Sequence, residues 1–192
     1  MDWDRDVIES RIAALEAAAK HEPPARRAAV AIALDLERSP RVLLMRRVRH
    51  PNDPWSGQIS LPGGGREPDD ADLVATALRE TREEVGVDLA RDATLLGPLI
   101  PRLARARGRI VPMDVSPFVF ALDREVAPTS SDEAEEAFWL PLDRAVLGEL
   151  DDVHRYEIGG GVRELPAWRF EERVVWGMTY GILRDFLAAV RV

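Results

Sequence analysis

The spacing of apolar residues predicts three main helices along the chain. Apolar side chains recur every three or four positions in residues 2–20, and two prolines follow that stretch. A second helix is expected after Asp69 and Asp70, which supply an N-cap and negative charge that suits the helix dipole, and it ends at Gly86. Residues 178–190 repeat the helical spacing and predict a last, amphipathic helix.

Short apolar runs between these helices predict strands. They cover residues 26–36, 41–47, 58–61, 94–100, 110–122, 137–140 and 167–170. A short helix is expected at 141–149, glycines 159–161 should close a hairpin, and the arginine-rich residues 102–109 should form a loop between two strands. Because strands and helices alternate without repeats or low-complexity linkers, the pattern predicts an α/β fold. We expect one domain over residues 25–192, with a helix from residues 1–24 packed on it.

Composition and charge narrow the function. The chain has 192 residues and no Cys, so it can bury a core without disulfides, and zinc fingers, iron–sulfur clusters and Cys nucleophiles are excluded. A net charge of −8 argues against binding to a nucleic-acid polymer or an anionic membrane surface. No apolar stretch reaches the roughly 20 residues of a membrane span, and the acidic N-terminus is unlike a signal peptide. We expect a cytoplasmic protein whose partner is a small molecule.

Three glutamates share one face of the central predicted helix. Glu80, Glu83 and Glu84 are spaced i, i+3 and i+4, which places them on the same side. Such a face suits either solvent or a cation, and Mg²⁺ is bound by a few carboxylates together with water and phosphate oxygens. Gly63 and Gly64 lie shortly before the same helix, where the backbone must turn or approach something closely. This combination favours a metal site over a solvated face.

The sequence of residues 79–87, RETREEVGV, resembles the second half of the Nudix box, GX5EX7REUXEEXGU, in which X is any residue and U is an aliphatic residue. Counting back from Arg79 reaches Ala71 at the position of the box glutamate. A shift of one residue instead reaches Asp70, with Gly64 in the place of the box glycine, and this variation resembles the coenzyme A pyrophosphatase branch of the family, whose loop is one residue longer.

Other segments resemble the same branch over most of the chain, from about residue 26 to residue 187. The sequence GQISLPGG at 57–64 is similar to its GXXXFPGG segment, and LLMRR at 43–47 is similar to its LLTXR segment. One landmark differs, because Asp53 stands where the branch has an arginine.

The resemblance implies a Nudix fold, which is an α/β/α sandwich with a mixed β-sheet and a loop–helix–loop metal site. It also implies hydrolysis of a diphosphate bond with Mg²⁺ or Mn²⁺ as the cofactor, and it assigns the metal to the carboxylates of Glu67, Glu80, Glu83 and Glu84. Arg79 would hold the glutamate helix against the loop. Glu133 is the candidate general base, although solvation alone also accounts for any single member of the acidic run at 131–136. The implied catalytic residues are Arg79, Glu83, Glu84 and Glu133.

Substrate binding is assigned to the glycine turn, to an aromatic side chain beside it and to arginines, whose guanidinium suits phosphate. The predicted substrate-binding residues are Arg46, Arg47, Trp55, Gly63, Gly64 and Arg105, with Arg105 on the loop at 102–109. The leading substrate is coenzyme A or a derivative, cleaved to 4′-phosphopantetheine and 3′,5′-ADP.

Two alternatives stay open. The first is a housecleaning Nudix hydrolase for nucleoside triphosphates, ADP-ribose or dinucleoside polyphosphates, which Asp53 favours. The second is a non-catalytic nucleotide-binding regulator on the same fold. The apolar faces of the first and last helices also offer surfaces through which two copies can form a homodimer.

Overall fold

The computed structural model describes residues 3–16, 26–51, 53, 55–106, 109–158 and 161–191. The helices within these ranges are α1 (Arg5–Glu16), α2 (Leu73–Val85), α3 (Leu89–Asp92), α4 (Leu142–Val146) and α5 (Gly177–Val190). The strands are β1 (Arg26–Asp35), β2 (Arg41–Arg47), β3 (Ile59–Ser60), β4 (Gly63–Gly65), β5 (Ala93–Pro98), β6 (Arg102–Ala106), β7 (Arg109–Leu122), β8 (Ala134–Pro141), β9 (Asp151–Ile158), β10 (Gly161–Phe170) and β11 (Arg173–Trp176).

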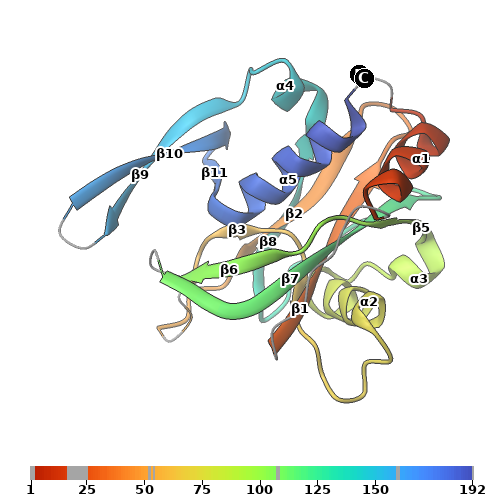
Figure 1. The fold of residues 1–192 in the computed structure, drawn as a ribbon, viewed down its shortest axis with the longest axis horizontal. Helices are drawn as coiled ribbons and strands as arrows, with labels where there is room; N and C mark the ends of the chain where they lie inside the picture. The colour runs from red at the N-terminus through yellow and green to blue at the C-terminus, as the bar shows by residue number, and fades with distance from the viewer. Residues whose placement is uncertain are drawn as a thin grey trace.

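The strands form a large mixed sheet and a smaller one. The large sheet runs in the order β3-β2-β1-β7-β5, with β4 paired to β1, β6 to β7 and β8 to β2. Only β1 and β7 pair in parallel among these described strands, from Arg26 opposite Met113 to Leu34 opposite Ala121. Strands β11, β10 and β9 form the second sheet, and β9 and β10 project from the body of the molecule (Figure 1).

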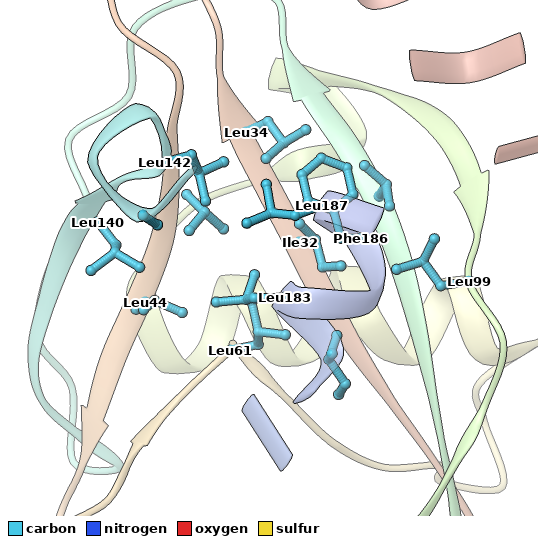
Figure 2. Close-up of a cluster of buried hydrophobic side chains, with 14 of the residues drawn as sticks. Ile32, Leu34, Leu44, Leu61, Leu99, Leu140, Leu142, Leu183, Phe186 and Leu187 are labelled. Atoms are coloured by element: carbon cyan, nitrogen blue, oxygen red, sulfur yellow. The ribbon is translucent and has the colours of Figure 1, made fainter. Parts of the chain in front are cut away.

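Helices cover both faces of the large sheet (Figure 1). On β1, Ile32 and Leu34 point to the face covered by α1 and α5, where Leu183, Phe186 and Leu187 meet them (Figure 2). The alternate residues of β1, which are Ala29, Ala31 and Ala33, belong to the other core, under α2. Since successive residues of a strand face opposite sides, β1 lines both cores. The predicted α/β/α sandwich with a mixed sheet is confirmed.

Helix α1 and helix α5 bury their apolar faces inside the chain. Ile8 and Ile12 of α1 are fully buried in the same core as Phe186 and Leu187 of α5, and Trp3 lies against Phe186 with ring centroids 6.5 Å apart. The apolar faces offered for pairing of two copies are therefore occupied within one chain. The homodimer and the division of the chain at residues 24 and 25 stay predictions. No helix in the described ranges is both long and apolar enough to cross a membrane.

Several expected elements need correction. Residues 102–106 form strand β6 rather than a loop, because they pair with β7 from Arg102 opposite Val115 to Ala106 opposite Arg109. The N-cap of α2 is Asp72, whose carboxylate accepts the Ala75 N–H at 2.8 Å, and not Asp69 or Asp70. The strand expected at 167–170 is the end of β10, which pairs with β9 from Gly161 to Trp168 and with β11 from Ala167 to Phe170.

Some expected features lie outside the described residues. They are the end of the first helix at Lys20, the two prolines at 23 and 24, and the glycines at 159 and 160. The hairpin that these last glycines were expected to close is nevertheless present, because Gly161 pairs with Ile158.

The three consecutive glycines form strand β4 instead of a turn, and the expected close approach of backbones is found there. Gly63 stands opposite Val30 on β1 with a φ of 149°, and a Cβ at this position would lie 2.2 Å from the Ala29 carbonyl oxygen. Only glycine tolerates both the conformation and the contact. Gly65, by contrast, has open space around its Cβ position and no positive φ.

Replacing Gly63 by Ala should therefore lower the free energy of unfolding by at least about 2 kcal/mol, since backbone strain and overpacking each cost roughly 1–3 kcal/mol. Gly65→Ala is the matched control and should change it by less than about 1 kcal/mol. Urea denaturation of both variants measures the difference. Equal stabilities would show that β4 does not lie against β1 in this way.

Candidate active site

Helix α2 carries the predicted carboxylates and is fixed at both ends. It begins after the cap at Asp72 and ends at Gly86, which has the left-handed φ of 69° and donates its N–H to the Arg82 carbonyl. Thr81 stands at a position that is aliphatic in the Nudix box, and it is fully buried. Its hydroxyl donates to the Ala77 carbonyl at 2.7 Å. A threonine is accepted there since its polar group is satisfied within the helix.

Arg79 joins the helix to the loop that precedes it. Its Nε and Nη2 donate to the two oxygens of Asp70 at 3.0 Å each, and Nη2 also donates to the Gly65 carbonyl at 3.1 Å. Its Nη1 lies 3.0 Å from both Glu80 and Glu83. The predicted role of Arg79 in holding the helix against the loop agrees with this geometry, and Asp70 supplies the carboxylate that the one-residue shift assigns to it.

Asp70 is buried and fully engaged. Besides Arg79, it accepts the Thr76 hydroxyl and the Glu67 backbone N–H, each at 2.9 Å. The hydrogen bonds from Arg79 are the main reason that the pKa of Asp70 lies far below its usual range, and burial only partly opposes them. Asp70 is thus a permanent anion that fixes the loop.

Glu84 is the most buried of the three glutamates, with 1% of its surface exposed. Its Oε2 accepts the Gly63 N–H at 2.7 Å, and its Oε1 lies 3.6 Å from Nη1 of Arg47. Burial raises the pKa of Glu84 to about 8, and the charges of Glu80 and Glu133 add to this effect against the opposing contacts of Gly63 and Arg47.

Glu80 lies beside the glycine strand. A Cβ at Gly64 would lie 2.5 Å from Oε1 of Glu80, so the backbone at this residue passes directly against the carboxylate. Burial is the largest cause of a raised pKa at Glu80, opposed by Arg79. Glycine is needed at this position because any side chain would displace the carboxylate.

The two remaining predicted carboxylates lie at the rim. Glu133 is exposed, and its charge adds to the effect of burial in raising the pKa of both Glu80 and Glu84. Its carbonyl accepts the Val48 N–H at 2.9 Å, which ties this loop to the end of β2. The Glu67 carboxylate lies 3.9 Å from Arg79, and 63% of its side chain is exposed.

The two arginines at the end of β2 point in different directions, although both were predicted to bind substrate. Arg47 reaches the carboxylates and donates to Asp53 Oδ2 through Nε at 3.0 Å and Nη2 at 2.9 Å. Arg46 lies across from Glu136 on β8 and binds it at 2.8 Å, together with Arg173 of β11. The structure therefore brings only Arg47 to the glutamates.

Trp55 and Arg105 meet at the edge of β6. The indole N–H of Trp55 donates to the Arg105 carbonyl at 3.0 Å, and the Trp55 backbone N–H donates to Asp53 Oδ1 at 2.9 Å. The sequence placed these two residues in one site without linking them. Arg102 of the same strand binds Asp185 on α5 instead, and Arg107 lies outside the described residues.

An aromatic cluster on the small sheet was not expected from the sequence. The His154 and Tyr156 rings lie 4.3 Å and 4.9 Å from the Trp176 ring. Alternation along β9 places His154 and Tyr156 on one face, so period-two spacing was the available signal.

The donor atoms are of the type that binds a divalent metal, but their arrangement in the structure is not that of a metal site. Within the described ranges, no three His, Cys, Asp or Glu side chains are grouped closely enough to hold an ion. Arg79 occupies oxygens of Glu80 and Glu83, and Glu84 is turned toward Gly63. The donors are nevertheless all carboxylate oxygens, the type that Mg²⁺ and Mn²⁺ prefer, and burial makes the charges on Glu80 and Glu84 costly without a cation.

Comparisons with known proteins agree on one family. The NUDIX domain profile matches residues 24–158. A protein called uncharacterized Nudix hydrolase NudL from Escherichia coli O1:K1 is 31% identical over 175 residues, which cover 87% of this chain and 84% of the relative. The protein of the same name from Salmonella paratyphi B is 32% identical with the same coverage.

Solved structures show the same fold. A Caenorhabditis elegans Ap4A hydrolase in a binary complex aligns with a TM-score of 0.51 and 21% identity, covering 64% of this chain and 84% of that one. A MutT/nudix family protein from Enterococcus faecalis also has a TM-score of 0.51, with 18% identity, covering 90% of this chain and 64% of that one.

The pair formed by Asp70 and Arg79 should be the most costly ion pair to break. Because Asp70→Asn removes the buried charge that accepts hydrogen bonds from both Nε and Nη2 of Arg79, it should lower the free energy of unfolding by roughly 3–5 kcal/mol. The exposed pair of Arg155 and Glu164 is the control, and Glu164→Gln should cost about 0–1 kcal/mol. Urea denaturation compares them, and similar losses would refute the structural role of Asp70.

Glu84 should destabilise the metal-free protein at alkaline pH. Its folded pKa is raised to about 8 above a usual value of 4.5, so stability falls as pH rises from about 4.5 to 8 and stays low above that range. Glu84→Gln keeps an acceptor for the Gly63 N–H but removes the charge, and should raise the melting temperature at pH 9 in a chelator. At pH 4 the two proteins should melt alike, and a variant no more stable at pH 9 would contradict the raised pKa.

Proposed function

Because the chain belongs to the Nudix family of hydrolases, we propose that it hydrolyses the diphosphate bond of coenzyme A or one of its derivatives. Family membership makes it a pyrophosphohydrolase of nucleoside diphosphate-linked small molecules, in a family that uses divalent metals such as Mg²⁺ or Mn²⁺. The observation that carries the proposal is the junction of α2 with β4, where the Asp70–Arg79 pair holds the helix so that Glu80 and Glu84 lie against the glycine backbone.

The proposed roles follow from the position of each group. Glu80, Glu83 and Glu84 would hold the Mg²⁺ or Mn²⁺, which supplies positive charge at the phosphoryl oxygens. Glu133, exposed at the rim, would accept a proton from the attacking water. The water oxygen forms a bond to phosphorus as the bridging oxygen leaves, and the products are 4′-phosphopantetheine and 3′,5′-ADP. Glu67 would be a further ligand from the loop.

Metal binding would have to change the contacts of Arg79. In the structure, Arg79 lies 3.0 Å from one oxygen of Glu80 and one of Glu83, and a cation held by these carboxylates would compete with its guanidinium. Arg79 keeps two hydrogen bonds to Asp70 and one to Gly65 that do not involve these glutamates. The arginine can therefore release the two glutamates while it still anchors the loop.

The choice of coenzyme A rests on the resemblance of residues 43–47 and 57–64 to the coenzyme A pyrophosphatase branch. Asp53, which replaces an arginine of that branch, binds Arg47 and the backbone of Trp55. This difference supports the second candidate, a housecleaning hydrolase for nucleoside triphosphates, ADP-ribose or dinucleoside polyphosphates. A non-catalytic regulator has less support because all three glutamates are retained.

The proposal predicts metal-dependent cleavage led by coenzyme A in a panel with ADP-ribose, NADH, dinucleoside polyphosphates and nucleoside triphosphates. Glu83→Gln should lower kcat at least about a hundredfold, since metal stabilisation of the transition state is worth several kcal/mol and each 1.36 kcal/mol is tenfold. Half of the Glu83 side chain is exposed, so its loss should not disturb the fold. Chromatography of the products measures both effects.

Glu37→Gln is the control, because Glu37 is exposed in the turn between β1 and β2, at the end of β2 opposite to Arg47. It should keep the rate of the original protein. Preference for another panel member would replace the substrate and keep the reaction, whereas no turnover on any of them would favour the regulator.

A further inference from the structure

The arginines of β2 and α2 that were assigned to the site already have carboxylate partners. Arg47 binds Asp53, and Arg46 binds Glu136. Arg79 is shared among Asp70 and the glutamates of its own helix. A guanidinium whose N–H groups are held by carboxylates has few donors left for a phosphate. The predicted phosphate contacts therefore cannot all come from these residues.

Arg105 differs from them in having a fixed backbone and a free side chain. Its side chain is exposed, and no acceptor in the described part of the chain binds its guanidinium. Its backbone pairs with Ile110 of β7, and its carbonyl accepts the indole N–H of Trp55 at 3.0 Å. Arg105 thus presents an unpaired cation from an anchored position.

The strand register places Arg105 on the same face of the sheet as α2. On β7, Phe118 and Phe120 belong to the core under α2, and Ile110 lies an even number of residues before them. Residues separated by an even number share a face of a strand, and directly opposed residues of two strands share it too. Since Arg105 stands opposite Ile110, its side chain lies on the face that carries the glutamates.

A series of contacts sets the separation between Arg105 and the glutamates. From Glu84 it passes to Arg47 at 3.6 Å, then to Asp53 at 2.9 Å, and from Asp53 to the Trp55 backbone at 2.9 Å. The indole of Trp55 then reaches the Arg105 carbonyl. The backbone of Arg105 is therefore linked to the glutamates through Asp53 and Trp55, and these two residues set its place relative to them.

We propose that Arg105 binds a phosphate group of the substrate that lies outside the scissile diphosphate, as in a nucleoside 3′,5′-bisphosphate unit. The inference rests on the proposed function, because it takes the diphosphate to lie at the glutamates. A chain with a net charge of −8 needs an unpaired cation where a polyanion binds, and a guanidinium can hold a phosphate through two parallel hydrogen bonds. Asp53 and Trp55 are positioning residues for this contact.

Binding of adenosine 3′,5′-bisphosphate and of 5′-AMP, measured by calorimetry, tests the inference because the two ligands differ by the remote phosphate. The original protein should prefer the bisphosphate, and Arg105→Gln should reduce that preference by roughly 10- to 100-fold, as expected for charge-assisted hydrogen bonds. Arg38→Gln is the matched control, since Arg38 is exposed in the turn between β1 and β2 and lacks a recorded partner among the described residues. It should keep the preference.

Trp55→Phe tests the positioning role, because it keeps an aromatic ring and removes the N–H that binds Arg105. The preference for the bisphosphate should fall part of the way, and adding this change to Arg105→Gln should have no further effect on the preference. A purely structural role of Trp55 would weaken both ligands equally and leave their ratio unchanged, which would contradict the role given to it.

Two results would overturn the assignment of Arg105. One is equal binding of the two ligands by the original protein. The other is an unchanged preference in Arg105→Gln, including the case in which the preference is abolished instead by Arg49→Gln, a change at another exposed arginine just after β2. Binding is measured without turnover, so the outcome is separate from the proposed reaction. If coenzyme A is not cleaved but the preference depends on Arg105, the substrate proposal fails and the phosphate site stands.

Discussion

The hydrogen-bonded pair of Asp70 and Arg79 is the constraint on which the rest of the site depends. The planar guanidinium donates to both Asp70 oxygens and to the Gly65 carbonyl, so helix α2 and the glycine strand are held in one orientation. The Gly63 N–H can then reach Glu84, and the backbone at Gly64 can lie against Glu80. A lysine could not make these contacts together, because it lacks the fork of donors.

This arrangement concentrates negative charge where water is excluded. Burial raises the pKa of Glu80 and Glu84, so the folded protein without a cation carries carboxylates whose ionisation is unfavourable. The buried Asp70 has the opposite behaviour because Arg79 and two further donors bind it. Carboxylates within one short segment therefore differ in ionisation: the hydrogen bonds of Asp70 favour its anion, whereas burial disfavours the charges of Glu80 and Glu84.

Local sequence patterns predicted much of the fold and the glutamate face, whereas contacts between residues far apart in the sequence could be predicted only in part. The spacing of Glu80, Glu83 and Glu84 depends on helix geometry alone, and β2 was placed correctly at residues 41–47. Strand β6 was taken for a loop because residues 102–109 are rich in arginine and its pairing with β7 is irregular. The separation of Arg46 from Arg47 follows from strand alternation, but their acidic partners depend on the tertiary fold.

The arginines of β2 show how one carboxylate changes the distribution of positive charge in the site. Asp53 binds Arg47, and Glu136 binds Arg46, so both guanidinium groups at the end of this strand are largely neutralised by their partners. The same Asp53 orders the Trp55 backbone, whose indole in turn fixes the carbonyl of Arg105 on β6. A negative charge at position 53 therefore weakens one cation beside the glutamates while it helps to place another farther from them. If Arg105 binds a remote phosphate as we propose, an anionic substrate would lie extended, with its reacting phosphates at α2 and its remaining charge toward the β6–β7 hairpin.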